Sequence, residues 1–429
     1  MTAAPRTVAV LPFANLSSDP ATAYFADATA EAIGDALAAV RAIRVSPHAA
    51  ALDWTDRGGS PQEIASGLGA DVLLEGGAKR NAEAVHFEVR LRGSDGSSLW
   101  STIVDRPAAE TVAAEAEVVR GALEALRVTP AADEAVRLGR APTANPQAYD
   151  QYLRGRIFTR ELLRRSQEAA LHHFGEALRL DPSFARALAE TAVCHGMIYQ
   201  YWDSSDEHLK RADEASTRGL TLAPELPHTH MARGLALALA TRYEEANREF
   251  AAALEIRPDL LDACYFRARS ARAQGAFADA VSWFERTWAL RPLDYAVPAL
   301  LASAYVSLDR RDDALATRRK SVELAERRVV RHPDDSRALY LGAACLSTLG
   351  EGTKARSWAK RALAMDPDDS AVLYNVACVY ALLGLDDSAV DCLEQAIQHG
   401  FRHWDWIEHD SDFDTVRTNE RFKALRGVR

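Results

Sequence analysis

The stretch that decides the fold runs Gly234-Leu-Ala-Leu-Ala-Leu-Ala-Thr-Arg-Tyr-Glu-Glu-Ala-Asn-Arg-Glu-Phe250-Ala-Ala-Ala-Leu-Glu-Ile-Arg-Pro258. Its alanine, aromatic and proline positions return along the chain every 34 residues. A period of this length is typical of helical hairpins that stack side by side and bury one another's apolar faces. The spacing relates Ala246 to Ala280 and Ala314, Phe250 to Phe284, Pro224 to Pro258 and Pro292, and Pro333 to Pro367.

The order of small, aromatic, small and proline positions resembles the tetratricopeptide repeat (TPR), and Gly234 to Pro258 is the best copy. In such a repeat, small residues let two antiparallel helices approach, an aromatic side chain fills the gap beside them, and proline ends the second helix. Two copies are longer than the others, and in the second of them the extra length predicts an extended helix over residues 312–330. We count seven copies over residues 149–400, ending near Pro182, Pro224, Pro258, Pro292, Pro333, Pro367 and Phe401.

The first 128 residues follow a different pattern, in which short apolar runs alternate with helical spacing. The predicted strands cover residues 7–13, 43–45, 72–74, 85–91 and 99–104, and the predicted helices cover residues 24–40, 61–68 and 111–126. The pairs Gly76-Gly77 and Gly93 to Gly96 suit hairpin turns. We therefore predict a two-part α+β chain, with a mixed-sheet α/β domain followed by an all-α superhelical solenoid.

Four short motifs mark this region: Val8-Ala-Val-Leu-Pro-Phe-Ala-Asn-Leu16, Tyr24-Phe-Ala-Asp27, Leu73-Leu-Glu-Gly76 and Leu99-Trp100. Together they are similar to the TolB amino-terminal-like domain of bacterial multidomain signalling proteins. The resemblance implies a non-catalytic module at residues 1–128, of a kind often placed beside cyclase, kinase or DNA-binding domains. A proline-containing linker with a short helix is expected at residues 129–148, and residues 401–429 are expected to cap the open end of the solenoid.

Composition and charge narrow the functional classes. The chain has 61 acidic and 51 basic side chains and a net charge of -10, which disfavours non-specific nucleic-acid binding. Its five cysteines have no C-x-x-C spacing, which indicates buried residues in a reducing compartment. No apolar run reaches membrane-span length and the start lacks a signal-peptide layout, so we expect a cytoplasmic protein that does not contact a membrane.

No motif in the sequence predicts catalysis, a cofactor or a metal ion. Gly67-Leu-Gly-Ala-Asp-Val72 lacks the third glycine of a dinucleotide loop. Asp410-Ser-Asp-Phe-Asp414 starts like a calcium loop but lacks the later glycine and glutamate. We therefore expect no enzyme. An unrecognised active site at the carboxyl ends of the N-terminal strands, near Asn15, Asp19 and Asp27, is the open alternative.

The TPR resemblance implies which side chains line the concave surface of the solenoid. Tyrosine supplies contact area at a small cost in entropy, and arginine pairs with two oxygens of a carboxylate. We therefore predict a groove that binds a protein or peptide partner with acidic groups. The paired lysines that accompany a chaperone-tail ligand are absent, although Asn375 matches that pattern. The predicted groove residues are Arg156, Arg186, Tyr265, Phe266, Arg269, Arg272, Arg337, Tyr340, Tyr374 and Asn375.

The sequence thus predicts a non-enzymatic interaction scaffold or adaptor in bacterial signalling that binds its partner in the concave TPR groove. The alternative is a regulatory subunit of a separately encoded output enzyme, such as a nucleotide cyclase or kinase, or a transcription regulator. The identity of the partner and a homo-oligomeric state stay open at this stage.

Overall fold

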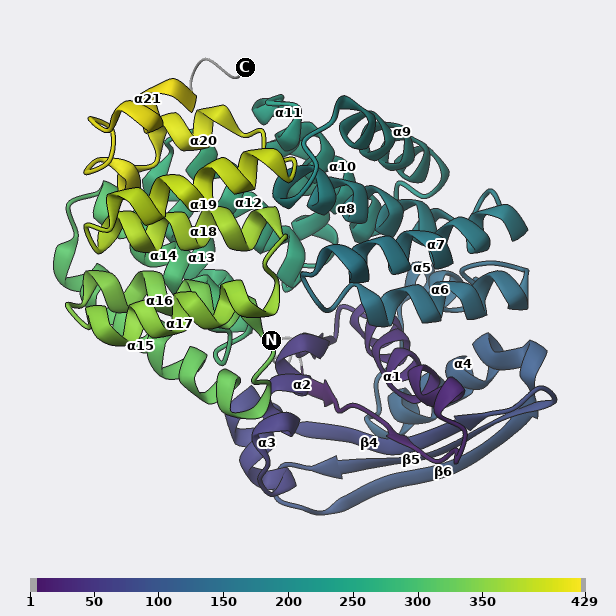
Figure 1. Ribbon diagram of the computed structural model, residues 1–429. Coiled ribbons are helices and arrows are strands. Elements are labelled where there is room, and N and C mark those ends of the chain that lie inside the picture. The colour runs from purple at the N-terminus through teal and green to yellow at the C-terminus, as the bar shows by residue number, and fades with distance from the viewer. Residues whose placement is uncertain (1–5, 426–429) are drawn as a thin grey trace.

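The computed structural model describes residues 6–425, and its helical part is a curved array of antiparallel helix pairs (Figure 1). The predicted stack of helical hairpins is confirmed, and the extended helix is α15 (Arg311–Arg331). The other helices of the array are α6 (Pro146–Phe158), α7 (Arg164–Leu180), α8 (Ala185–Tyr201), α9 (Asp206–Leu222), α10 (Pro227–Leu239), α11 (Tyr243–Ile256), α12 (Leu261–Ala273), α13 (Phe277–Leu290), α14 (Ala296–Ser307), α16 (Ser336–Thr348), α17 (Gly352–Met365), α18 (Ser370–Leu382) and α19 (Asp386–Gln398).

The packing inside each pair follows from the small and aromatic positions of the repeat. A Cβ atom added at Gly234 of α10 would lie 2.7 Å from the Phe250 ring of α11, so only glycine fits at this approach. Beyond α19 the chain continues through α20 (Trp404–His409), a 3-10 turn (Ser411–Phe413) and α21 (Glu420–Leu425). Phe413, Val416 and Phe422 from this segment are buried against the last pair.

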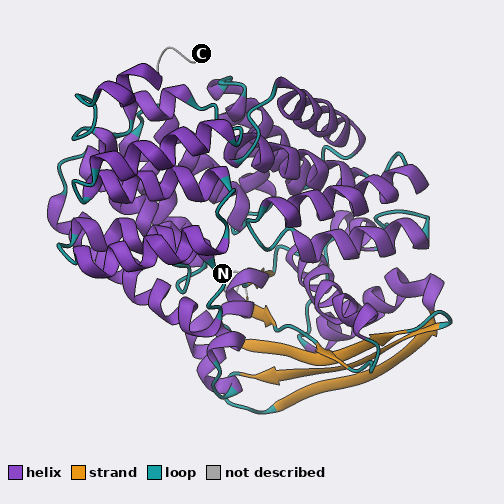
Figure 2. Cartoon of the chain, in the orientation of Figure 1, coloured by secondary structure: helices purple, strands orange, loops and turns teal. Residues whose placement is uncertain are grey.

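The N-terminal region forms the predicted mixed sheet (Figure 2). Its strands lie in the order β3-β1-β4-β5-β6. β1 pairs in parallel with β3 and β4, whereas β4, β5 and β6 pair antiparallel. Alternating side chains of β1 and β4 face two layers: α1 and α4 on one side, α2 and α3 on the other. The bounds are β1 (Arg6–Val10), β2 (Ala14–Asn15), α1 (Ala23–Ala38), β3 (Ile43–Val45), α2 (His48–Arg57), α3 (Pro61–Leu68), β4 (Val72–Arg80), β5 (Ala84–Gly93), β6 (Ser98–Pro107), α4 (Thr111–Ala125) and α5 (Ala132–Leu138).

Two features of this region were predicted wrongly or missed. Gly76 and Gly77 do not form a turn but lie inside β4, and the chain turns after Arg80 instead. A Cβ atom at Gly76 would lie 2.2 Å from the Glu88 carbonyl oxygen of β5, so these glycines permit close strand pairing. No element was predicted for residues 48–57. They form helix α2, which begins directly after Pro47.

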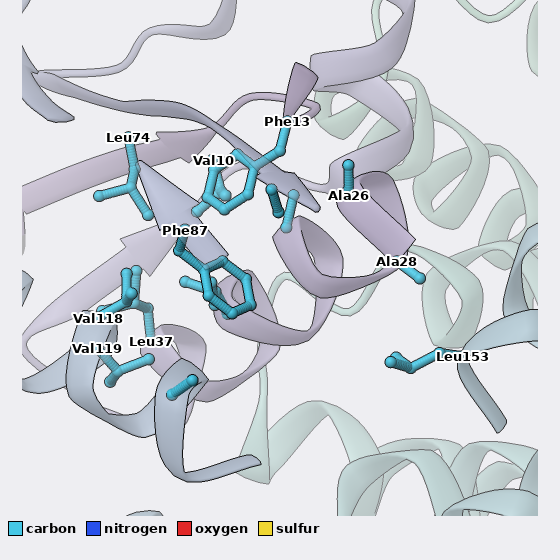
Figure 3. Packing of buried hydrophobic residues seen from close by; sticks show 14 of the residues in the cluster. Val10, Phe13, Ala26, Ala28, Leu37, Leu74, Phe87, Val118, Val119 and Leu153 are labelled. Atoms are coloured by element: carbon cyan, nitrogen blue, oxygen red, sulfur yellow. The ribbon is translucent and has the colours of Figure 1, made fainter. Parts of the chain in front are cut away.

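One hydrophobic core joins the N-terminal domain to the first repeats. It contains Phe25 and Phe87 from the N-terminal domain together with Tyr149, Tyr152 and Phe174 from α6 and α7. Figure 3 shows the part of this cluster around Phe87 and Leu74, with Leu153 of α6 at its edge. The two parts of the chain therefore form one body, across the predicted linker. Residues 1–5 of the predicted N-terminal domain and 426–429 of the predicted cap lie outside the described residues.

Glu115 of α4 is a buried acid at this junction. The Tyr149 hydroxyl donates a hydrogen bond of 2.7 Å to Oε2, while Oε1 has no partner among the described residues. Burial raises the pKa of Glu115 to about 8, although the Tyr149 hydrogen bond and Arg186 act to lower it. The carboxyl group is therefore protonated in the folded protein at neutral pH but ionised in the unfolded chain.

Glu115→Gln is expected to raise the free energy of unfolding at pH 7 by about 3 kcal/mol, because the amide does not need to take up a proton on folding. Since the folded pKa lies above the unfolded value, the advantage of the variant shrinks as the pH falls toward about 4.5, where both states bind the proton. Denaturant unfolding at several pH values measures this difference. A difference that is the same at pH 4.5 and pH 7 would contradict the assignment.

Candidate functional site

Helix α1 carries three carboxylates on one face. Asp27, Glu31 and Asp35 are four residues apart, so they lie one above the other along the helix. α1 lies between the sheet and the solenoid (Figure 1), and its acidic side chains face arginines of the repeats. We call Asp27, Glu31, Asp35, and the residues Asp53 and Asp56 of α2, the acidic face.

The three α1 carboxylates are held by ion pairs with repeat residues. Arg160 pairs with Asp27 and also donates to Glu31 Oε2 at 3.0 Å, and Arg156 bridges Glu31 and Glu190. Asp35 accepts hydrogen bonds from Arg257 at 2.7 Å and Arg186 at 3.4 Å. Burial alone would raise the pKa of Glu31, but the two guanidiniums lower it to about 2. Glu31 therefore stays ionised at neutral pH, although its side chain is largely buried.

Helix α2 extends the acidic face toward later repeats. Both oxygens of Asp53 accept from Arg291, at 2.6 and 2.9 Å, in a bidentate pair. Asp56 lies 3.3 Å from Nε2 of His332, and Arg331 donates to the Arg57 carbonyl oxygen at 2.9 Å. The N-terminal domain is thus fixed to repeats that lie far apart in the sequence.

The solenoid residues that hold the acidic face have a signal in the sequence that the sequence analysis missed. Arg257, Arg291 and His332 come immediately before Pro258, Pro292 and Pro333, the prolines that end three successive repeats. Equivalent positions of stacked repeats form a row along the array. We call Arg257, Arg291 and His332 the basic row. Arg257 contacts Asp35 of α1, whereas Arg291 and His332 contact Asp53 and Asp56 of α2. The recurrence of a basic residue before each of these prolines is the signal that indicates an internal contact.

A second group of basic residues lies inside the solenoid. Arg269 and Arg272 lie on α12, and Arg337 lies on α16. The charge of Arg337 acts to lower the pKa of Arg269, and the charge of Arg269 acts to lower the pKa of Arg272. We call these three residues the interior arginine cluster. Arg269 donates to the hydroxyl of Tyr201 and, at 3.4 Å, to that of Tyr265. Among the described side chains, no carboxylate oxygen lies within 4.0 Å of the three guanidiniums, so their charge has no ion-pair partner there.

The structure gives the predicted groove residues different surroundings. Arg156 and Arg186 bind the acidic face, whereas Tyr265, Arg269, Arg272, Arg337 and Tyr340 surround the solenoid interior. Tyr374 donates to Asp410 at 2.7 Å and stacks on Phe401 of the C-terminal segment. Phe266 is buried, and the Asn375 amide donates to the Ala371 carbonyl oxygen. Contact of these residues with a partner stays a prediction.

The two ends of the array also touch each other. The Trp202 indole at the end of α8 donates to Asp369, the N-cap of α18, at 2.8 Å. Ser370 lies 3.4 Å from the Trp202 carbonyl oxygen, and Ser204 lies 2.9 Å from His403. We call the bond between Trp202 and Asp369 the closure contact. It brings the first long repeat against the last repeats.

The residues named above as an alternative active site or metal site form hydrogen bonds within the chain. Asn15 accepts from the Ser17 amide, Asp19 caps the turn at Ala21, and Asp27 accepts from His48 as well as Arg160. All five cysteines are buried and unpaired by disulfides, and burial raises the pKa of the Cys264 thiol to about 11. Ligand atoms of Cys378, Asp410 and Asp412 lie within 4.8 Å of one another, in the segment that begins like a calcium loop.

Similarity to known proteins agrees with the repeat geometry. Residues 370–398, which span α18 and α19, match the tetratricopeptide repeat family profile. The helix pairs form a TPR array. No helix within residues 6–425 combines the length and the apolar character that a bilayer crossing requires.

One curated relative and several solved structures are similar to this chain. The chain is 28% identical over 243 residues to "Putative adenylate cyclase 3" of Rhizobium meliloti (strain 1021), a match that covers 56% of this chain and 41% of that protein. The thermophilic TPR protein TTC0263 of Thermus thermophilus is 22% identical, with 42% and 94% of the two chains covered and a TM-score of 0.35. The human IFIT1 dimer with m7Gppp-AAAA is 14% identical, with 66% and 64% covered and a TM-score of 0.47.

Proposed function

We propose that this chain is a non-enzymatic interaction scaffold of bacterial signalling, whose TPR array binds a protein or peptide partner with acidic groups. The observation that carries the proposal is that several arginines of the array already bind carboxylates. Arg156, Arg186 and Arg257 each bind carboxylates of the chain's own α1. Arg269, Arg272 and Arg337, which the repeat register also assigns to the concave surface, form no ion pair within the described residues.

The shared core between the N-terminal domain and the first repeats supports a fixed role for that domain. Because Tyr149 and Tyr152 are buried with residues of α1 and α4, the domain serves as a support for the array and not as a detachable ligand. The carboxylates of this domain already neutralise Arg156, Arg186 and Arg257. An incoming partner therefore meets the interior arginine cluster.

Affinity capture with the full chain tests this proposal. A double variant, Arg269→Ala with Arg272→Ala, is expected to recover at least tenfold less of an acidic partner, since each lost charge-assisted bond costs about 1.5 to 3 kcal/mol. Arg319→Ala on α15, an exposed arginine without an ion pair among the described residues, is the matched control and is expected to recover the wild-type amount. Equal recovery of every partner from both variants would count against the groove.

A second candidate function is the regulation of a nucleotide cyclase, and the relative from Rhizobium meliloti favours it. The chain would then act on a catalytic domain encoded separately. A neighbouring gene for a cyclase or kinase domain without repeats supports this alternative. Addition of the purified chain to that enzyme is expected to change its rate, and an unchanged rate across a range of chain concentrations would count against it.

A further inference from the structure

The interior arginine cluster presents more positive charge than the surrounding chain neutralises. Arg269, Arg272 and Arg337 come from two helices that are not neighbours in the sequence, yet they share tyrosine neighbours. Arg269 lies over the rings of Tyr201 and Tyr265, with its central carbon 5.1 and 5.6 Å from their centroids. The phenol groups offer hydrogen bonds and cation–π contact, but they carry no formal charge at neutral pH.

Four carboxylates in this part of the chain have partners outside the cluster. Asp294 pairs with Arg291 at 3.0 Å, and Asp335 accepts from Arg328 at 2.8 Å. Asp369 accepts from Trp202, and Asp410 accepts from Tyr374. Among the described residues, none of the four forms an ion pair with the cluster, although the charge of Asp410 acts on Arg272 from a longer distance. The three guanidiniums can therefore still take an anionic ligand at ion-pair distance.

The arginines of the cluster also act on the pKa of Tyr265. Burial raises the pKa of this phenol, whereas Arg269, Arg337 and the hydrogen bond with Tyr201 lower it, so that it lies below its ordinary value. The pKa of Tyr201 is raised by burial, although the same two arginines act to lower it. Guanidiniums without an ion pair favour an anion over a neutral ligand.

We propose that the interior arginine cluster binds a phosphoryl group, with Arg269, Arg272 and Arg337 as its charged contacts and the hydroxyls of Tyr201 and Tyr265 beside it. A phosphate monoester carries about −1.5 to −2 charges near pH 7, and its three oxygens suit bidentate guanidinium bonds. It balances three arginines better than one carboxylate does. This inference rests on the proposed function, because it names the anionic group that the interior recognises. The group belongs to a free phosphate ester or to a phosphorylated side chain of the partner.

Pyrophosphate and inorganic phosphate are the probes for the site itself. With the full chain, either probe is expected to raise the melting midpoint by about 2 °C over sodium chloride of equal ionic strength, because a ligand that binds only the folded state stabilises it by mass action. Titration calorimetry well below the melting midpoint measures the same binding without unfolding. No heat of binding and no rise in the midpoint would overturn the inference.

Charge-removing variants locate the binding. Arg337→Gln and Arg272→Gln are each expected to weaken pyrophosphate binding at least tenfold, whereas Arg319→Gln on α15 retains wild-type binding. Glutamine keeps much of the side-chain volume and removes repulsion between the arginines, so the variants are expected to fold, which circular dichroism checks. Equal pyrophosphate affinity in wild type, Arg337→Gln and Arg272→Gln would place the anion elsewhere and overturn the inference.

A phosphoserine peptide and its serine counterpart distinguish the two sources of the group. Tighter binding of the phosphoserine peptide that depends on Arg337 points to a partner protein, and binding of pyrophosphate alone points to a small molecule; both results support the site. The capture experiment is judged separately. Capture of a partner without any binding of these probes would leave the proposed function standing and remove the phosphoryl inference, and the reverse result would do the opposite.

Discussion

Asp35→Ala is expected to lower the free energy of unfolding by about 3 to 5 kcal/mol, because removal of one partner of a buried ion pair leaves the other charge unpaired. Asp35 is the ligand of Arg257 at 2.7 Å and Arg186 at 3.4 Å, and His228 lies 3.8 Å away. Only 11% of its side chain is exposed, so water replaces little of what is lost. Urea unfolding of the full chain measures the change.

The control for this variant is Glu124→Ala, which removes an exposed acid of α4 that has no ion pair among the described residues. Its free energy of unfolding is expected to stay within about 0.5 kcal/mol of the wild type. If Asp35→Ala were as mild as Glu124→Ala, the contact between α1 and the basic row would contribute nothing to stability. The assignment of the acidic face as a structural contact would then be wrong.

Trp202→Ala is expected to cost about 3 to 5 kcal/mol and to open the closure contact, because it removes a large buried side chain and the donor that Asp369 binds. Amide hydrogen exchange in residues 366–371 is expected to speed up as the start of α18 loses its support. Mass spectrometry of peptides from this segment measures the change.

Trp288→Ala is the matched control, because the Trp288 indole donates to the Pro292 carbonyl oxygen within its own repeat and does not join the ends of the array. This variant is expected to lose stability while exchange in residues 366–371 stays at the wild-type rate. Unchanged exchange of that segment in Trp202→Ala would show that the two ends of the array are not held together through this residue.

The repeat period predicted the solenoid because close helix packing demands small and aromatic residues at fixed positions. The positions of Gly234 and Phe250 are decided by contacts within one hairpin, so the local sequence contains them. The strands were predicted from local apolar patterns in the same way. Gly76 and Gly77 are the exception, because they were predicted as a turn but lie inside β4. Their role depends on how closely β5 and Leu16 approach, and no local pattern shows that.

The groove was predicted from the repeat register alone. The register gives the position of a residue within its repeat, but it does not give the residues that its side chain contacts. Arg156 and Arg186 are bound to Glu31 and Asp35, which come from a separate part of the chain. The closure contact likewise joins residues that are 167 apart. Contacts of this kind depend on the curvature of the whole array, which accumulates from small rotations between repeats.

The most direct test of the central claim, that the basic row holds the acidic face, is a double-mutant cycle on Asp53 and Arg291. These residues are 238 apart in the sequence and form a bidentate pair between α2 and the end of α13. We predict that the losses in unfolding free energy from Asp53→Ala and Arg291→Ala are non-additive, with a coupling of about 1 to 3 kcal/mol. Additive losses, within about 0.5 kcal/mol, would contradict the contact and with it the claim that the basic row holds the acidic face.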